Sequence, residues 1–323
     1  MSGPTLPPAA TREAFLAARE QASRLREAVA ALAQEHGWSD AVPEPFDEGS
    51  LPVFAIGNDL VVKLFPPAWP EAPGIERAAL DALAGRLPVA TPVLRAQGVR
   101  DEWTWLAMDR LPGWPLDQVW PSIPREQQLA LMRSLGACLK VLHGLPLGDT
   151  AILRPDWPAW LADQRAHVRE RQAAKGLPER WLEGLEPFLD SVALPTDVEP
   201  VFLHTEIMAT HVLALPTGGA WRLSGLLDFE PAMAGAPEYD FASVGLFVTE
   251  GDPFLFDALL EGYGMPVAAR DESFQRRCLA YTLLHTYANL PWFLDRLGEP
   301  LEGPSYEALA RRWWALPARG LSS

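Results

Sequence analysis

The sequence predicts an α+β protein of two lobes, in which a small antiparallel sheet precedes a mostly helical part. The chain has 323 residues, and at roughly 100–200 residues per domain this length corresponds to two domains. Short extended segments alternate with turn residues in the N-terminal third, whereas helical periodicity dominates beyond Leu111-Pro112-Gly113. We therefore expect a first lobe over residues 1–113 and a second over residues 114–323.

The first lobe is expected to begin with a helix over residues 11–36, because apolar residues return there every three or four positions. Gly37 is typical of a helix end. The extended segments that follow are short and separated by turn residues; they span residues 53–56, 60–65, 92–97 and 103–108. A second helical pattern occupies residues 74–87, so the pattern predicts a small antiparallel sheet with one inserted helix.

The second lobe is expected to be largely helical, with apolar residues gathered on one face of each helix. The helical segments span residues 125–143, 157–173, 178–192 and, after Pro253, 273–297. Two short strand-like segments interrupt this pattern, at residues 201–204 and 223–228. These two segments carry the most informative polar residues of the chain.

The composition excludes several classes of protein. Hydrophobic residues make up 48% of the chain and charged residues 21%, which is typical of a globular protein and argues against extended disorder. No run of about 18 apolar residues predicts a membrane span, and the N-terminus lacks the apolar core of a secretory signal. Two cysteines, Cys138 and Cys278, are too few for a disulfide or metal framework, so we expect buried thiols in a cytoplasmic protein.

The formal net charge is -15. Binding to nucleic acid needs clustered Lys and Arg, so nucleic acid is not an expected partner. A membrane is not expected either, because no long apolar run predicts a span. The charge favours a cationic small-molecule ligand, although many cytoplasmic proteins are acidic for solubility alone. We expect a monomer or a weak dimer.

Two carboxylates each follow a strand-like run. Glu206 comes after residues 201–205 and Asp228 after residues 223–227, and Gly218-Gly219 predicts a hairpin turn between them. Paired carboxylates at strand ends suit one of two tasks. They hold a hard cation through oxygen ligands, or they position and transfer protons.

The residues around these carboxylates resemble the catalytic and metal-binding segments of the aminoglycoside phosphotransferase family. That family has His-Gly-Asp, four further residues and Asn, then Asp-Phe-Gly or a variant after a strand, then Gly-Asp-Pro-x-Tyr-Asp-hydrophobic-Ala. This chain has, in the same order and spacing, His204-Thr205-Glu206, His211, Asp228-Phe229-Glu230 and Gly235-Ala236-Pro237-Glu238-Tyr239-Asp240-Phe241-Ala242. The resemblance covers residues 45–295 and implies the two-lobed fold of protein kinases and choline kinases. A few local segments are similar to hygromycin B phosphotransferases.

The first lobe carries the matching nucleotide-binding residues. Lys63 resembles the lysine that holds the nucleotide phosphates, and Glu76 resembles the glutamate that orients this lysine. Residues 106–113 resemble the hinge between lobes, where the adenine binds. The expected nucleotide-binding set is completed by Met108 in the hinge and Ser50 in the loop at residues 46–50, which has one glycine where a glycine-rich loop would have several.

The resemblance also implies a role for each residue of the second segment. Asp228 is expected to bind Mg²⁺ that bridges the phosphates of ATP or GTP. Glu206 is expected to accept a hydrogen bond from the attacking hydroxyl and to aim it at the phosphate. His204 is expected to orient the catalytic loop, and Asp240 to anchor it.

Several residues depart from the family pattern, and three of them bear most directly on catalysis. Glu206 is one methylene longer than Asp, and a misplacement of about 1 Å can slow a reaction on the order of a hundredfold. Mg²⁺ prefers oxygen ligands, so His211 is expected either to bind a phosphate or to hold a single metal ion together with Asp228. Thr205 replaces a glycine, which restricts the backbone of the loop.

The resemblance implies phosphorylation of a hydroxyl on an aminoglycoside or aminocyclitol, an activity of the antibiotic-resistance type. The acidic candidates for binding such a cationic acceptor are Glu238, Glu250, Asp252 and Asp295. Two alternatives stay open. One is a metabolic kinase that acts on a sugar or an amino alcohol. The other is a nucleotide- or ligand-binding protein without catalysis, which the departures at Glu206 and His211 favour.

Overall fold

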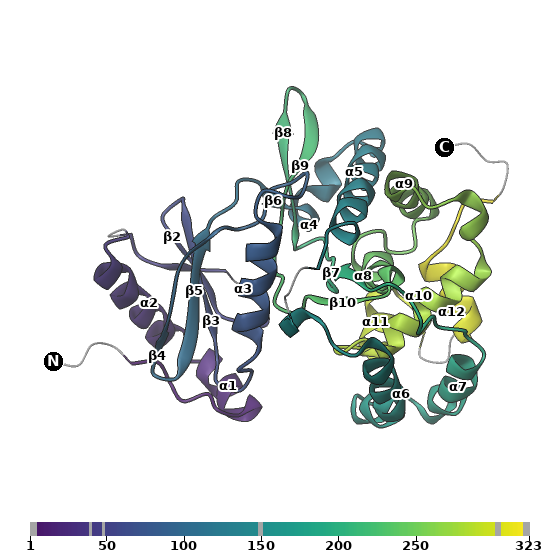
Figure 1. Cartoon of the computed structure of the whole chain (residues 1–323), viewed down its shortest axis with the longest axis horizontal. Coiled ribbons are helices and arrows are strands. Elements are labelled where there is room, and N and C mark those ends of the chain that lie inside the picture. The colour runs from purple at the N-terminus through teal and green to yellow at the C-terminus, as the bar shows by residue number, and fades with distance from the viewer. Residues whose placement is uncertain (1–4, 39–40, 47–48, 148–150, 301–304, 319–323) are drawn as a thin grey trace. The chain divides into compact units, whose positions relative to one another are not determined.

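The computed structural model describes residues 5–38, 41–46, 49–147, 151–300 and 305–318 (Figure 1). The chain divides into two compact units. The first comprises Met1–Arg86, Ala90–Pro112 and Gly225–Pro231, and the second comprises Leu87–Val89, Gly113–Ser224 and Ala232–Ser323. The division of the sequence at residue 113 assigned Gly225–Pro231 to the second lobe, whereas the structure places this segment, and Asp228 with it, in the first unit.

The first unit contains a five-stranded antiparallel sheet with the order β1-β2-β3-β5-β4. The strands are β1 (Glu44–Pro45), β2 (Val53–Ile56), β3 (Leu60–Phe65), β4 (Leu94–Arg100) and β5 (Trp103–Asp109). The central strand β3 is rich in β-branched and large apolar residues, which favours a strand buried between neighbours. Lys63 lies in this strand, opposite Val53 of β2 and Leu106 of β5. The predicted antiparallel sheet is confirmed.

Three helices accompany this sheet: α1 (Arg12–Arg19), α2 (Ala22–His36) and α3 (Ala72–Leu83). The prediction of one helix over residues 11–36 is wrong, because Gln21 leaves the helical conformation and separates α1 from α2. Gly37 ends α2 with a φ of 64°, a conformation that glycine adopts at little cost. Helix α3 buries an apolar face against the sheet and carries Glu76 on that face, where the side chain is fully buried.

The second unit is mostly helical, as predicted. Its helices are α4 (Leu116–Val119), α5 (Arg125–His143), α6 (Trp157–Ala174), α7 (Glu179–Asp190), α8 (Asp240–Phe247), α9 (Pro253–Tyr263), α10 (Glu272–Leu284), α11 (Leu290–Arg296) and α12 (Tyr306–Trp313). Short 3-10 turns lie at Trp120–Ser122, Ala151–Leu153, Pro237–Tyr239 and Val267–Ala269. The strands are β6 (Trp114–Pro115), β7 (Val201–Leu203), β8 (Val212–Thr217), β9 (Ala220–Leu226), which ends in the first unit, and β10 (Met233–Gly235). They form two small sheets, β10-β7 and β6-β8-β9.

Two segments of this unit differ from the sequence expectation. The apolar-rich stretch 273–297 is not one helix, because residues 285–289 separate α10 from α11. Asn289 accepts a hydrogen bond from the backbone of Trp292 and so caps α11. The predicted hairpin at Gly218-Gly219 is present, but its first strand is β8, which the sequence pattern did not identify, and β7 pairs with β10 instead.

Helices α5 and α9 pack so closely that their backbones touch at glycines. A Cβ atom added to Gly136 of α5 would collide with the carbonyl oxygen of Leu259, and one added to Gly262 of α9 would collide with the carbonyl oxygen of Arg133. A side chain at either position would therefore force the two helices apart.

We expect Gly136→Ala to lower the free energy of unfolding by about 2 kcal/mol or more, because overpacking against a backbone cannot relax by rotation of a side chain. Gly184→Ala in α7 is the matched control, since its added Cβ would lie 3.4 Å from the ring of Tyr306, an ordinary contact. Alanine should stabilise that helix by about 0.5–1 kcal/mol. Urea denaturation of both variants tests the packing, and equal effects of the two substitutions would contradict it.

Cys138 and Cys278 are buried free thiols, as predicted. Burial raises the pKa of the Cys138 thiol to about 12, so it stays protonated and unreactive at neutral pH. Within the described part of the chain, no helix combines the length and the apolarity that crossing a bilayer requires.

Candidate active site

Lys63 is held between two carboxylates inside the first unit. Its Nζ atom lies 2.6 Å from Oε2 of Glu76 and 2.5 Å from Oδ1 of Asp228. The lysine and glutamate side chains are 8% and 2% exposed, whereas Asp228 is 28% exposed. The glutamate therefore fixes the lysine from the buried side, while the aspartate keeps access to solvent. Strand β3, helix α3 and the segment after β9 bring these residues together.

A third carboxylate, Glu230, lies close enough to act on the same lysine. Burial alone would lower the pKa of Lys63, but Asp228, Glu76 and Glu230 outweigh burial and hold that pKa above its ordinary value. Burial raises the pKa of Glu230 to about 7, a rise that Lys63 opposes and Asp228 reinforces. The sequence comparison missed Glu230, because it matched the third position of Asp-Phe-Glu to a glycine. We call Lys63, Glu76, Asp228 and Glu230 the phosphate site.

We expect Glu230→Gln to stabilise the protein at pH 8 in the absence of nucleotide and metal ions. The folded-state pKa of Glu230, about 7, lies above its ordinary value of 4.5. The stabilising contribution of Glu230 is therefore complete below pH 4.5 and is lost as the pH rises through 7. This loss lowers the free energy of unfolding by at most about 3 kcal/mol. Glutamine cannot ionise and escapes this loss. The free energy of unfolding at pH 8 and pH 4.5 measures the difference.

The exposed Glu71, which precedes helix α3, provides the control, because Glu71→Gln removes a carboxylate with a solvated side chain. Its stability should follow that of the unmodified protein at both pH values. The account of Glu230 is wrong if Glu230→Gln and Glu71→Gln show the same dependence on pH.

The loop of the second unit that contains Glu206 is anchored by Asp240, which is fully buried at the start of α8. Its carboxylate accepts hydrogen bonds from the backbone N–H groups of His204, at 3.1 Å, and Thr205, at 2.6 Å. His143 Nε2 lies 3.0 Å from the same carboxylate, and His143 Nδ1 lies 3.0 Å from the hydroxyl of Tyr263. This buried chain of hydrogen bonds fixes the backbone of the loop at His204 and Thr205.

Each histidine of the loop contacts the backbone of Glu206. Nδ1 of His204 accepts a hydrogen bond from the N–H of Glu206 at 3.3 Å, and Nδ1 of His211 donates one to its carbonyl at 2.8 Å. His204 is fully buried. Both contacts leave the Glu206 carboxylate uninvolved, so they order the loop without constraining the side chain.

Two non-glycine residues of the candidate site have positive φ angles, Thr205 at 72° and Asp228 at 67°. Side chains other than glycine rarely adopt this conformation, and it costs on the order of 1–2 kcal/mol. Such strain persists where the surrounding structure fixes the backbone, and it gathers at functional sites. Thr205 was expected to restrict the backbone of the loop, and its positive φ angle shows this effect as local strain.

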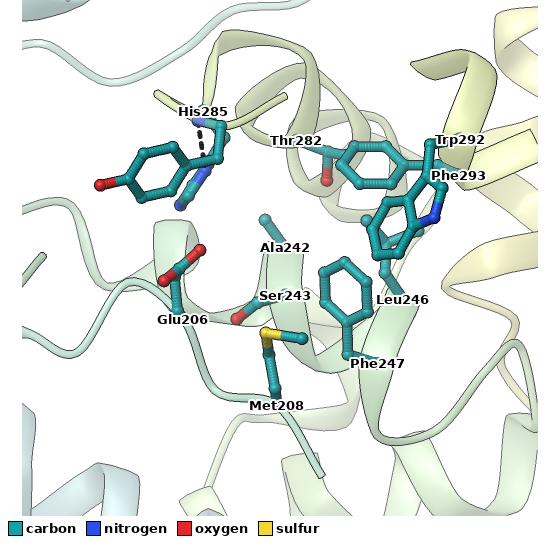
Figure 2. A pocket seen from close by; sticks show the side chains of 11 residues that line it. Glu206, Met208, Ala242, Ser243, Leu246, Phe247, Thr282, His285, Trp292 and Phe293 are labelled. Atoms are coloured by element: carbon teal, nitrogen blue, oxygen red, sulfur yellow. Dashed lines mark hydrogen bonds between the residues drawn. The ribbon is translucent and has the colours of Figure 1, made fainter. Parts of the chain in front are cut away.

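Glu206 borders a pocket that lies entirely in the second unit, which we call the Glu206 pocket. Figure 2 shows its lining residues, Glu206, Met208, Ala242, Ser243, Leu246, Phe247, Thr282, His285, Tyr287, Trp292 and Phe293. Glu206 and His285 lie at one end and Phe247, Trp292 and Phe293 at the other. The segment 285–289, which interrupts the helical stretch between α10 and α11, supplies part of the wall. The helical pattern over residues 273–297 gave no indication of this pocket, because it predicts a continuous helix there.

The acidic candidates for a cationic acceptor are mostly engaged with arginines of the same unit. Glu238 forms a bidentate pair with Arg277, at 2.6 and 2.8 Å. Glu250 pairs with Arg296 at 2.6 Å and Asp252 pairs with Arg125 at 2.8 Å, and Asp252 also caps α9. Asp295 is exposed on α11. None of these acids lines the Glu206 pocket.

Two further nucleotide candidates lie in the first unit. Met108 is buried in β5, opposite Val61 of β3 and Leu94 of β4. Ser50 is exposed just before β2. Within the loop that contains Ser50, residues 47–48 lie outside the described part of the chain.

The fold is similar to those of solved small-molecule phosphotransferases. The GDP complex of wild-type aminoglycoside 2'-phosphotransferase-IIIa has a TM-score of 0.69 and 18% identity, over 85% of this chain and 97% of that chain. The streptomycin–ATP complex of APH(2")-IIa has a TM-score of 0.61 and 16% identity, over 83% of this chain and 93% of that chain. Macrolide 2'-phosphotransferase from Brachybacterium faecium has a TM-score of 0.56 and 22% identity, over 90% of this chain and 99% of that chain.

The sequence also matches a family model directly. The model of the phosphotransferase enzyme family (APH) covers residues 42–274. This range spans most of the chain and includes the whole phosphate site, the loop of Glu206 and its anchor Asp240. The chain therefore belongs to the phosphotransferase enzyme family and is an enzyme of the kinase type.

Proposed function

We propose that this enzyme transfers the γ-phosphoryl group of ATP or GTP to a hydroxyl of a small molecule. In this reaction the hydroxyl oxygen forms a bond to the γ-phosphorus while the bond from that phosphorus to the β-phosphate oxygen breaks. The hydroxyl proton leaves toward a base, and the nucleoside diphosphate departs with the electron pair of the broken bond. Transfer is direct, without a phosphorylated enzyme.

The observation that carries this proposal is the fixed position of Lys63 between Glu76 and Asp228. Its raised pKa keeps the ammonium charged at any physiological pH. A fixed positive charge in a partly buried site stabilises the negative charge on phosphate oxygens without reorganisation during the reaction. Glu76 fixes its direction, which is the role of the lysine–glutamate pair in kinases.

The same site fits a magnesium ion. Three carboxylates surround one lysine, so the phosphate site has an excess of negative charge and oxygen donors that Mg²⁺ prefers. Within the described residues no group of three or more His, Cys, Asp or Glu side chains forms a complete metal site. Asp228 and Glu230 would therefore hold Mg²⁺ jointly with nucleotide oxygens and water. When bound, the ion neutralises charge on the phosphates.

Glu206 is the residue we assign to the acceptor hydroxyl. Its side chain borders the pocket, and its backbone is held by His204 and His211. A carboxylate in this position accepts a hydrogen bond from the acceptor hydroxyl. This bond orients the lone pair of the hydroxyl oxygen. We propose that His211, whose Nδ1 is engaged with Glu206, acts through Nε2 on a phosphate or the metal ion.

The acceptor belongs to one of two classes by analogy with the solved relatives. These include complexes with streptomycin, kanamycin and gentamicin and a macrolide 2'-phosphotransferase. Aminoglycosides and aminocyclitols carry several positive charges, whereas macrolides present a largely apolar ring. Either class would make the enzyme an antibiotic-resistance factor.

The proposal is tested by incubating the protein with ATP or GTP, magnesium and a panel of aminoglycosides, macrolides, sugars and amino alcohols. Mass spectrometry should detect an acceptor that has gained one phosphate. A product formed only from a sugar or amino alcohol would make the protein a metabolic kinase. Nucleotide binding without phosphorylation of any acceptor would identify a binding protein instead and would contradict the proposal.

A further inference from the structure

The Glu206 pocket is lined mainly by apolar and aromatic side chains. Glu206 is the one carboxylate among its described lining residues. Of the three hydroxyls among the described lining residues, those of Ser243 and Thr282 bond to the protein, and the third belongs to Tyr287. Ser243 Oγ accepts from the N–H of Ile207 and donates to the carbonyl of Asp240, and Thr282 Oγ donates to the carbonyl of Cys278. Besides Glu206, the polar groups of the lining residues are few; they include the hydroxyl of Tyr287 and the Nε2 atom of His285, which is buried without a hydrogen-bond partner among the described residues.

The one histidine among the described lining residues, His285, does not supply negative charge either. Burial lowers the pKa of His285 to about 4, although the Thr205 backbone and Asp240 oppose this, and the nearby charge of Arg171 lowers it further. His285 is thus neutral at physiological pH. The guanidinium of Arg296 lies over the ring of Phe247, 5.3 Å from its centroid. Arg171 thus places a positive charge near His285, whereas the charge of Arg296 is paired with Glu250.

Three of the four acids that could attract a polycation are paired with arginines, as described above. Binding several ammonium groups there would require those ion pairs to break. Binding several ammonium groups in the pocket would remove them from water, and one carboxylate together with cation–π contacts would offset only part of that cost. Both routes disfavour an acceptor that carries many positive charges.

We propose that the acceptor is an alcohol on a mainly apolar scaffold with at most one cationic group, and that Trp292 and Phe247 cover its apolar face while its hydroxyl contacts Glu206. This inference rests on the proposed phosphotransferase function and specifies its acceptor. Trp292 is 45% exposed and contacts Phe247 and Phe293. The cavity measures about 170 Å³, below the 300–1,000 Å³ of sites that enclose a whole drug-sized ligand. It therefore holds the hydroxyl-bearing end of the acceptor.

The test compares the binding of two probes to the full chain by calorimetry, with a non-hydrolysable ATP analogue and magnesium present. Erythromycin represents apolar alcohols with one amine, and kanamycin represents polycations. We expect erythromycin to bind more tightly, and its affinity to change little when the salt concentration is raised, because apolar contacts are not screened. Tighter binding of kanamycin, or no binding of erythromycin or any other macrolide in the panel, would overturn the proposal.

Variants of Trp292 test whether erythromycin binds in the Glu206 pocket. Trp292→Ala should weaken erythromycin binding roughly tenfold or more, as loss of a central aromatic contact does. Trp292→Glu should weaken it further and should strengthen kanamycin binding, since it adds a second negative charge to the pocket. Trp69→Ala, at a partly exposed tryptophan of the first unit, should change neither affinity, and thermal melting verifies that each variant folds. Unchanged erythromycin binding in both Trp292 variants would overturn the assignment.

Phosphorylation of the same probes separates this inference from the proposed function. Transfer of phosphate to kanamycin alone would leave the phosphotransferase function intact and reject the apolar acceptor. Binding of erythromycin through Trp292 without phosphate transfer to any compound would support the apolar pocket and reject the catalytic function.

Discussion

Replacing Glu206 by glutamine is expected to reduce kcat on the order of a hundredfold to ten-thousandfold, the usual contribution of a general base. Glutamine retains the length of the side chain, and the bonds of Glu206 to His204 and His211 use its backbone, so the loop should keep its structure. The KM for ATP should stay the same, because Lys63 and Asp228 belong to the first unit. Steady-state kinetics with the best acceptor of the panel measure both quantities.

Glu183→Gln provides the matched control, because it makes the same substitution at an exposed position of α7. Its kinetics should equal those of the unmodified enzyme. Full activity of the Glu206→Gln variant would remove the catalytic role assigned to Glu206. A shared loss of activity in both variants would point to a general effect of the substitution and would count against that role as well.

Replacing Asp228 by asparagine is expected to lower kcat on the order of 10²–10³-fold, the loss seen when one charge-stabilising group is removed. Asparagine is isosteric and can still contact Lys63, which also keeps Glu76 at 2.6 Å. The negative charge that would hold Mg²⁺ is lost, so half-maximal activity should require more magnesium. Activity measured against magnesium concentration tests both effects.

The control for this variant is Asp81→Asn, at an exposed position of α3, the helix that carries Glu76. It should show the magnesium dependence of the unmodified enzyme. If Asp228→Asn lowered kcat without any change in magnesium requirement, Asp228 would not be a metal ligand. Asp228→Asn and Glu206→Gln should therefore differ in their magnesium dependence, since Glu206→Gln should leave the magnesium requirement unchanged.

Much of the fold follows from local sequence. The segments 53–56, 60–65 and 125–143 coincide with β2, β3 and α5, because strong apolar patterns meet clear turn residues at their ends. The interruption of the stretch 273–297 was missed because both halves are apolar. Asn289 followed by Pro291, a helix-start signal, could have located it.

The candidate site shows where sequence reasoning stops. Lys63 and Asp228 stand out locally, since each is a charge beside buried apolar residues. The ion pairs that engage Glu238, Glu250 and Asp252 join residues 39, 46 and 127 positions apart, and no local pattern predicts such partners. The expected binding of a polycation by these acids therefore depended on contacts that only the folded chain reveals.

The central claim is that phosphate passes from the nucleotide to an alcohol, and isotope transfer tests it most directly. ATP or GTP with heavy-oxygen-labelled γ-phosphoryl oxygens is incubated with the enzyme, magnesium and each acceptor of the panel in turn, and the products are analysed by mass spectrometry. Our account predicts the labelled phosphoryl group on an acceptor, in an amount equal to the nucleoside diphosphate released, and its loss in Glu206→Gln. Label found only in inorganic phosphate, or remaining entirely in the nucleotide with every acceptor, would contradict it.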